Sequence, residues 1–162
     1  MRKRIITDPV PPGVKPAESG WLDLELLTTV EVTSEDPAHP VEAALLPHRD
    51  GGTGWRAAGP GPQTLRLLFD LPTPVRRVRL VFREGGAGRT QEFVLRWSGD
   101  GGRSYREVVR QQYTFSPPGT AEEVEDYRVN LDEVTALELR VVPDIGGGDV
   151  VASVGRVQVA GG

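Results

Sequence analysis

The sequence predicts an all-β fold, a sandwich of about eight antiparallel strands, from three observations. Apolar and polar residues alternate along most of the chain, as where Leu65, Leu67 and Phe69 share one face and Arg66 and Asp70 share the other. A period of two residues is typical of strands that bury one face. No long stretch has the period of an α-helix. The 20 glycines and 14 prolines among 162 residues supply many turns.

The alternation places the strands at 21–33, 64–70, 76–83, 92–98, 105–113, 127–131, 137–143 and 150–160. In the last strand the apolar positions change phase at Gly155 and Arg156, which predicts a β-bulge there. Residues 41–46 are expected to form a helical turn.

The first 20 residues contain Pro9, Pro11, Pro12 and Pro16 and have no periodic pattern. Proline fixes φ and lacks the amide donor, so this segment is predicted to be an extended arm or linker, docked or disordered. Residues 21–162 are predicted to form one domain, because a chain of this length supports a single core.

Composition excludes several classes of function. The net charge is -4, which does not favour nucleic acid or anionic lipid as a partner. The absence of cysteine excludes disulfides, thiolate zinc sites and a cysteine nucleophile. Two histidines leave little for a histidine metal site, and no metal or other cofactor is predicted. No apolar run is long enough for a signal peptide or a membrane span, so we expect a cytoplasmic protein that does not insert into membranes.

The lengths of the connections distinguish the two ends of the predicted sandwich. Successive connections between antiparallel strands alternate between its ends. The connections at 71–75, 99–104 and 132–136 are short and would share one end. Those at 34–63, 84–91, 114–126 and 144–149 would share the other, and most of them are long or irregular. Long loops on a rigid scaffold are where binding residues usually lie, so the second end is the predicted binding end.

Six short motifs follow one another between Thr29 and Ala160. They are Val30–Ser34, Asp50–Trp55, Leu65–Leu71, Val94–Ser98 followed by Asp100-Gly101 and Tyr105, Ala136–Val142, and Ala152–Val154. This order resembles that of the discoidin-like domains, also called coagulation-factor type C or galactose-binding-like domains, which include bacterial carbohydrate-binding modules. The resemblance implies a jelly-roll sandwich. It also implies a binding module without catalysis that recognises sugars, phospholipid heads or proteins through the loops at one end.

The resemblance also bears on calcium. Relatives often hold a structural calcium between the Asp-Gly loop, which Asp50 and Thr53 match, and an acidic residue of the closing strand. Here Gly155 and Arg156 stand where that acid is expected. An arginine opposes a cation, so we predict that the calcium site is absent or degraded.

A sugar site needs paired hydrogen-bonding groups for neighbouring hydroxyls and an aromatic face for the ring. His48 and Arg49, with Tyr113 or Phe115, could supply both. The candidate ligand-binding residues are His39, His48, Arg49, Arg89, Gln112, Tyr113, Phe115 and Asp144. The alternative is that these residues are solvated, brace loops or, for Asp144 with Asp149, form turns.

Other conspicuous residues have structural interpretations. Trp55 and Trp97 are predicted to pack in the core. The outward arginines Arg66, Arg77, Arg79, Arg96 and Arg140 alternate with Glu92 and Glu138, which predicts cross-strand ion pairs rather than a surface for an acidic partner.

No pair of carboxylates has a spacing that implies a shared catalytic site, although a glycosidase pair is not excluded. The sequence therefore predicts a non-catalytic carbohydrate-binding module. The alternative is an intracellular protein–protein interaction domain or assembly subunit, and an enzyme is the third possibility. The ligand is a glycan or a protein, and the oligomeric state is open.

Overall fold

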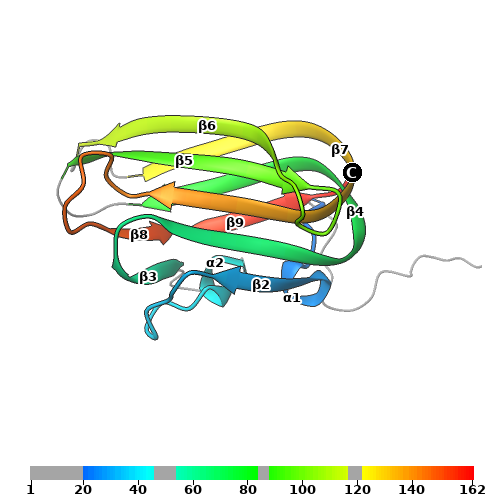
Figure 1. Cartoon of the computed structure of the whole chain (residues 1–162), viewed down its shortest axis with the longest axis horizontal. Helices are drawn as coiled ribbons and strands as arrows, with labels where there is room; N and C mark the ends of the chain where they lie inside the picture. The colour runs from blue at the N-terminus through cyan, green and yellow to red at the C-terminus, as the bar shows by residue number, and fades with distance from the viewer. Residues whose placement is uncertain (1–19, 46–53, 84–87, 117–121) are drawn as a thin grey trace, which may run out of the picture.

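The computed structural model describes residues 20–45, 54–83, 88–116 and 122–162. These residues form an all-β fold, as predicted (Figure 1). The elements in chain order are α1 (Leu24–Leu27), β2 (Thr28–Val32), α2 (Glu42–Leu45), β3 (Trp55–Pro60), β4 (Gln63–Arg83), β5 (Arg89–Ser98), β6 (Arg106–Phe115), β7 (Glu122–Val142), β8 (Val151–Val154) and β9 (Arg156–Ala160). Neither helix is long enough to cross a membrane.

The strands form two layers that share β4 and β7. The first half of β4 pairs with β2 on one side and with the second half of β7 on the other. The second half of β7 pairs in turn with β5, and β5 pairs with β6. The second half of β4 pairs with the first half of β7 on one side and with β9 on the other. All these pairs are antiparallel. A separate two-stranded sheet joins β3 to β8.

The prediction of separate strands on each side of 71–75 and 132–136 is wrong. The chain stays extended through both segments, so β4 and β7 each run for 21 residues and bend from one layer into the other. Their pairing register shifts three times between Leu68 and Arg77. Pro72 and Pro74 lie in this stretch and have no amide to donate, which accounts for a bend at this point rather than a regular ladder.

The beginning of the domain also differs from the prediction. The alternation of Leu22, Leu24 and Leu26 predicts a strand, but residues 24–27 form one helical turn. The Asp23 carboxylate accepts a hydrogen bond from the Leu26 amide at 3.1 Å, which caps the turn. Leu24 is buried and Leu26 is 66% exposed. The predicted helical turn at 41–46 is confirmed as α2.

The predicted bulge at Gly155 is a change of sheet. Ala152 and Val154 are buried in β8, whereas Val157 and Val159 are buried in β9. The Gly155 amide between them donates to the carbonyl of Val81 at 2.7 Å. The chain thus leaves the small sheet and joins β4, so 150–160 contains two strands rather than one. The structure also has β3 within the connection predicted at 34–63.

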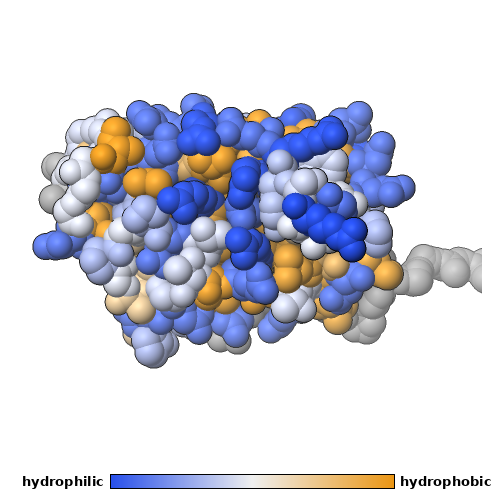
Figure 2. Space-filling view, in the orientation of Figure 1, coloured by the Kyte–Doolittle hydropathy of each residue, from blue (hydrophilic) through white to orange (hydrophobic). Residues whose placement is uncertain are grey.

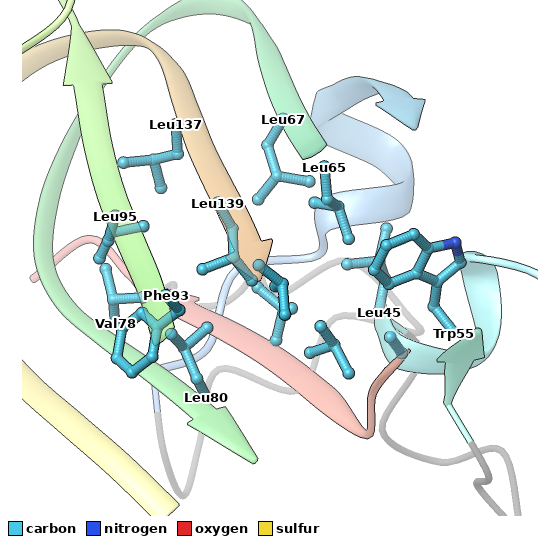
Figure 3. Close-up of a cluster of buried hydrophobic side chains, with 14 of the residues drawn as sticks. Leu45, Trp55, Leu65, Leu67, Val78, Leu80, Phe93, Leu95, Leu137 and Leu139 are labelled. Atoms are coloured by element: carbon cyan, nitrogen blue, oxygen red, sulfur yellow. The ribbon is translucent and has the colours of Figure 1, made fainter. Parts of the chain in front are cut away.

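The core lies between the two layers. Figure 3 shows Leu65, Leu67 and Leu139 from one layer directed at the same interior as Val78 and Leu80 from the other. All five are at most 3% exposed. Each buried side chain of this size contributes about 1.5–3 kcal/mol of transfer free energy, so this interior holds the two layers together.

The tight hairpin after β5 and the bends lie at one end of the sandwich, as the connection lengths predict. The Gly101 amide donates to Thr135 Oγ1 at 2.8 Å, and that hydroxyl donates to the carbonyl of Ser98 at 3.0 Å. The hairpin 99–104 therefore contacts the bend of β7. We call this end, on the right in Figure 1, the turn end.

The opposite end collects irregular connections. The Ile145 amide donates to the carbonyl of Thr90 at 2.9 Å, which ties the connection between β7 and β8 to the start of β5. The Gly61 amide donates to the carbonyl of Val150 at 3.3 Å, which adds the turn between β3 and β4. We call this end, on the left in Figure 1, the loop end.

Candidate ligand site at the loop end

A hollow of about 240 Å³ opens at the loop end. It is lined by Gly61, Pro62, Val142, Pro143, Asp144, Ile145, Gly147, Gly148 and Val150. We call it the loop-end hollow. Its walls are mostly apolar, and among the described residues that line it Asp144 is the one ionisable group. A mostly apolar concavity with a few polar groups is the usual form of a small-molecule site.

The turn that carries Asp144 is held by its own backbone. Asp144 Oδ1 accepts from the Gly146 amide at 3.0 Å, and the Asp144 carbonyl accepts from the Gly147 amide at 3.0 Å. Gly147 and Gly148 have φ of 88° and 93°, which favours glycine at both positions. Asp144 is therefore a turn former, which is one of the two roles expected of it, and it also lines the hollow.

A buried polar chain fixes this turn to the sheet. The Arg89 guanidinium donates through Nε to the carbonyl of Pro143 and through Nη2 to Gln91 Oε1 at 3.0 Å. Gln91 Nε2 in turn donates to Tyr113 Oη at 2.7 Å. Arg89 is only 6% exposed and Gln91 is fully buried. Arg89 thus braces the loop that carries Asp144, which is the alternative role that the sequence analysis left open.

The predicted stacking surface is not available at Phe115. This ring is fully buried, 5.0 Å from the ring of Tyr113 and beneath the Arg89 guanidinium. The prediction that Phe115 contacts a sugar ring is therefore wrong. Tyr113 is partly buried and packs against the core, and burial raises the pKa of its hydroxyl. The cause is strand register, since residues 113 and 115 face the core from β6.

Of the remaining predicted ligand-binding residues, the two that the structure describes, His39 and Gln112, are not brought together. His39 Nδ1 lies 3.6 Å from Asp36 Oδ2, in the segment after β2. Gln112 is exposed on β6 and donates to Glu92 Oε2 at 3.1 Å. Neither lines the loop-end hollow. His48 and Arg49 lie outside the described residues, so their predicted role stays a prediction.

The calcium motif lies partly outside the described residues, because Asp50 and Thr53 fall there. At the closing strand, a Cβ on Gly155 would lie 2.8 Å from Arg83 Nη1. Arg83 of β4 thus lies against Gly155, at the place where the resemblance leads us to expect an acidic calcium ligand. Within the described part of the chain, no group of three or more histidines or carboxylates could hold a metal ion.

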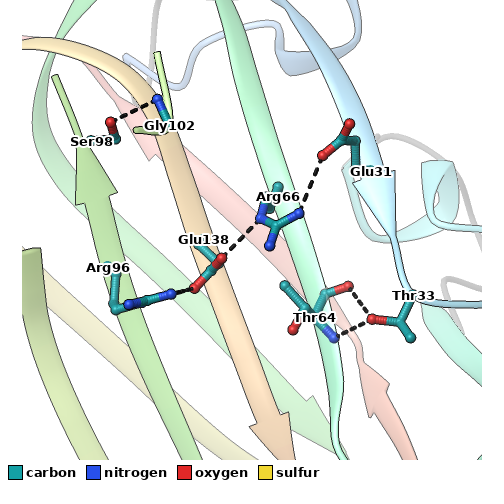
Figure 4. A network of polar contacts seen from close by, with 8 residues as sticks. All are labelled: Glu31, Thr33, Thr64, Arg66, Arg96, Ser98, Gly102 and Glu138. Carbon is teal, nitrogen blue, oxygen red and sulfur yellow. Dashed lines mark hydrogen bonds and ion pairs between the residues drawn. The ribbon is translucent and has the colours of Figure 1, made fainter. Parts of the chain in front are cut away.

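A larger hollow of about 660 Å³ runs along β2 and the start of β4. Its polar groups, main-chain and side-chain, are already engaged with one another. The Thr64 amide donates to Thr33 Oγ1 at 2.9 Å, and Arg66 Nη1 lies 3.4 Å from Glu31 Oε1 (Figure 4). A ligand would have to displace these contacts, so the loop-end hollow is the better candidate.

Four of the five outward arginines, Arg66, Arg77, Arg79 and Arg96, form cross-strand ion pairs, as predicted. Arg66 and Arg96 both donate to Glu138, which lies between them on β7 (Figure 4). Arg77 pairs with Asp126 at 2.6 Å on the other layer. Figure 2 shows the same pattern on one face, where apolar side chains gather in small groups among hydrophilic ones. This face therefore lacks the broad apolar patch that a large protein interface needs.

One carboxyl pair on β7 was not predicted from the sequence. Glu123 and Glu125 are partly buried on one face of β7, and they share a hydrogen bond. Tyr127 Oη also donates to Glu125 Oε1. The hydrogen bond between Glu123 and Glu125 raises the pKa of Glu123 to about 7, with smaller contributions from burial and from repulsion by Glu125. The signal was available, because residues two apart on a strand point to the same side.

This pair predicts a stability that depends on pH. A folded-state pKa above the unfolded one means that wild-type stability is full at pH 4 and falls as the pH rises towards 7 and beyond. Glu123→Gln mimics the protonated form. It should match the wild type near pH 4 and exceed it by about 1 kcal/mol at pH 8.5, where the partial exposure of the pair keeps the difference small. Thermal unfolding followed by circular dichroism between these pH values measures the difference.

Glu122→Gln is the matched control. Glu122 is exposed on the other face of the same strand and pairs with Arg83 at 3.0 Å. Its substitution should cost little at every pH in this range. If the stabilities of the two variants change with pH in the same way, Glu123 and Glu125 do not share a proton.

No protein-family model matches the sequence, and no curated protein is significantly similar to it. Solved structures do match. The family 32 carbohydrate-binding module of NanJ from Clostridium perfringens, in complex with galactose, has a TM-score of 0.64 and 17% identity. That match covers 86% of this chain and 97% of the module. The fold is the discoidin-type jelly roll.

Two further structures show how widely this fold is used. CpGH89CBM32-5 from Clostridium perfringens, in complex with GalNAc-β-1,3-galactose, has a TM-score of 0.63 and 18% identity, over 86% of this chain and 99% of that one. XRCC1, bound to the catalytic domain of DNA polymerase β, has a TM-score of 0.59 and 16% identity, over 84% of this chain and 97% of that one. The discoidin-type fold thus includes sugar-binding and protein-binding examples.

Proposed function

We propose that this protein is a non-catalytic carbohydrate-binding module whose ligand occupies the loop-end hollow. The observation that supports this most directly is a hollow with one carboxylate at the loop end of a fold whose neighbours include sugar-binding modules. The resemblance to discoidin-like domains also implies binding through the loops at one end, and the loop-end hollow lies at such an end. The ligand contacts proposed here differ from the predicted ones, because Phe115 is buried.

The chemistry of the hollow suits a single sugar ring. Pro62, Pro143 and Ile145 offer an apolar wall for the C–H face of a pyranose, and Ile145 is 49% exposed. The Asp144 carboxylate can accept hydrogen bonds from two neighbouring hydroxyls. Such sites are weak, because each hydroxyl gives up good hydration for its new bond, so we expect a Kd on the order of 0.1–1 mM.

The second candidate is a protein-interaction domain. The likeness to XRCC1, which was solved bound to a DNA polymerase domain, favours it. A protein partner would contact a broad surface rather than one hollow of about 240 Å³.

The test is an amide NMR titration with galactose, N-acetylglucosamine and glucose. We expect shifts at Gly146, Gly147 and Gly148 for at least one sugar. Asp144→Asn keeps an oxygen for the Gly146 amide but removes the charge, so it should weaken binding about tenfold, or about 1.4 kcal/mol.

Asp149→Asn is the matched control, since Asp149 is exposed in the same connection but does not line the hollow. Its affinity should equal that of the wild type. If no sugar shifts these amides at about 10 mM, the binding free energy is below about 3 kcal/mol and the carbohydrate proposal fails. Stoichiometric recovery of one protein partner would then favour the interaction domain.

A further inference from the structure

A second hollow, of about 460 Å³, lies at the turn end, opposite the loop-end hollow. It is lined by Trp97, Gly99, Asn130, Leu131, Asp132 and Glu133. Trp97 is near the end of β5, and residues 130–133 belong to the segment where β7 bends between the layers. We call it the turn-end hollow. It shares no residue with the loop-end hollow.

Trp55 and Trp97, the tryptophans of β3 and β5, differ in burial and in the partner of the indole N–H. Trp55 is fully buried, and its indole N–H donates to the carbonyl of Ser34 at 3.0 Å. Trp97 is only partly buried, and its indole N–H donates to none of the described residues. Buried tryptophans usually satisfy this donor within the protein. Trp97 therefore has both ring surface and a donor left for solvent or for a ligand.

The position of the Trp97 ring is fixed by its neighbours. A Cβ on Gly99 would lie 3.2 Å from Trp97 Cζ3 and 3.3 Å from the carbonyl of Glu133. A side chain at residue 99 would therefore crowd the ring and the bend of β7. Trp97 also packs against the core. The ring is thus a rigid surface and not a mobile one.

The polar rim is also held in place. The Arg76 guanidinium donates to the carbonyl of Leu131 at 2.6 Å and to Asp132 Oδ1 at 2.9 Å. Asp132 is 79% exposed even so, and Asn130 and Glu133 are exposed beside it. The rim therefore presents one amide and two carboxylates to solvent next to the indole.

From this juxtaposition we propose that the turn-end hollow is a second saccharide site, for a neutral pyranose that stacks on Trp97. The C–H face of such a ring is apolar and slightly positive, which suits the negative face of an indole. The Asn130 amide can donate and accept, and the carboxylates of Asp132 and Glu133 can accept from hydroxyls. The two carboxylates repel anionic sugars, so the ligand is neutral.

The site has a different residue set from the loop-end proposal and does not rest on it. A protein with sugar sites at both ends could bridge two glycan chains or bind one branched surface more tightly than either site alone.

The experiment follows the indole N–H signals in amide NMR spectra during titration with galactose, glucose and galacturonic acid. Trp97→Phe assigns the Trp97 signal and keeps an aromatic ring in the core. We expect galactose or glucose to shift the Trp97 signal with a Kd on the order of 1 mM, while the Trp55 signal stays fixed. Galacturonic acid should bind several-fold more weakly.

Asn130→Ala tests the rim without touching the core, since Asn130 is exposed. It should raise the Kd obtained from the Trp97 signal at least fivefold. Asp70→Asn is the control, because Asp70 is exposed near the turn end and does not line the hollow. It should leave the affinity unchanged.

Asp144→Asn separates this proposal from the loop-end one. A Trp97 shift that persists in this variant supports the second site, even if the loop-end amides never respond to any sugar. Three results would overturn it: no Trp97 shift with any neutral sugar at about 50 mM, a shift that disappears with Asp144→Asn, or an unaltered shift in Asn130→Ala.

Discussion

Gly54→Ala is expected to destabilise the fold by about 3 kcal/mol, the largest effect of any single methyl group that we predict. Gly54 precedes β3 and has a φ of 75°, a conformation that L-residues rarely adopt. A Cβ there would lie 2.3 Å from the carbonyl oxygen of Val154 and 2.6 Å from the Cα of Gly155. Both are backbone atoms of the segment that pairs with β3, so only a shift of that small sheet could relieve the overlap.

Two other glycines separate the causes of this loss. Gly61 also has a positive φ, of 92°, but a Cβ there meets nothing within 4 Å. Gly61→Ala should therefore cost about 1 kcal/mol, from the backbone alone. A Cβ on Gly59 also meets nothing, and its φ is not positive, so Gly59→Ala should stay within about 0.5 kcal/mol of the wild type. Urea unfolding at pH 7 gives all three values. If Gly54→Ala costs no more than Gly61→Ala, the close approach to Val154 is wrong.

Most of the strands could be predicted because each carries one apolar face. Leu65 and Leu67, or Val78 and Leu80, alternate with arginines regardless of which strand lies beside them. The bends could not be predicted in the same way. Pro72 and Pro74 have the composition of a turn, and whether an extended chain turns back or crosses to another layer depends on the partner strand.

The candidate site was predicted less well than the fold. Grouping loops by length placed Asp144 at the loop end, where it lies in the structure, but it also grouped Tyr113 and Phe115 with the loops. These two residues alternate with Gln112 and Thr114, which already indicates a strand with Phe115 on its apolar face. The turn-end hollow could not be predicted, because Trp97 and Asn130 are brought together only by the bend of β7.

Glu138→Gln is expected to cost about 2 kcal/mol at pH 7, because it removes the charge at the centre of a three-residue network. Glu138 faces outward from β7, yet its side chain is only 4% exposed. It accepts from Arg66 Nε at 2.8 Å and from Arg96 Nε at 2.8 Å. Burial alone would raise the pKa of the Glu138 carboxyl, but the hydrogen bonds from Arg96 and Arg66 outweigh it and lower the pKa.

Glu31→Gln provides a control on the same arginine. Glu31 lies 3.4 Å from Arg66 Nη1, but its side chain is 53% exposed. An exposed pair of this kind contributes about 0–1 kcal/mol, so the substitution should be nearly neutral. The contrast compares a buried carboxylate that bridges Arg66 and Arg96 with an exposed carboxylate that contacts Arg66 alone.

The pH dependence gives the sign of the Glu138 effect. A lowered folded-state pKa means that the stability from Glu138 is full above its unfolded pKa, near 4.3, and is lost as the pH falls through the folded value. The difference between the wild type and Glu138→Gln should therefore be largest at pH 7 and shrink towards pH 3. Chemical unfolding at both pH values measures it. A loss at pH 7 no greater than that of Glu31→Gln would show that the network holds the sheet no more firmly than an exposed ion pair does.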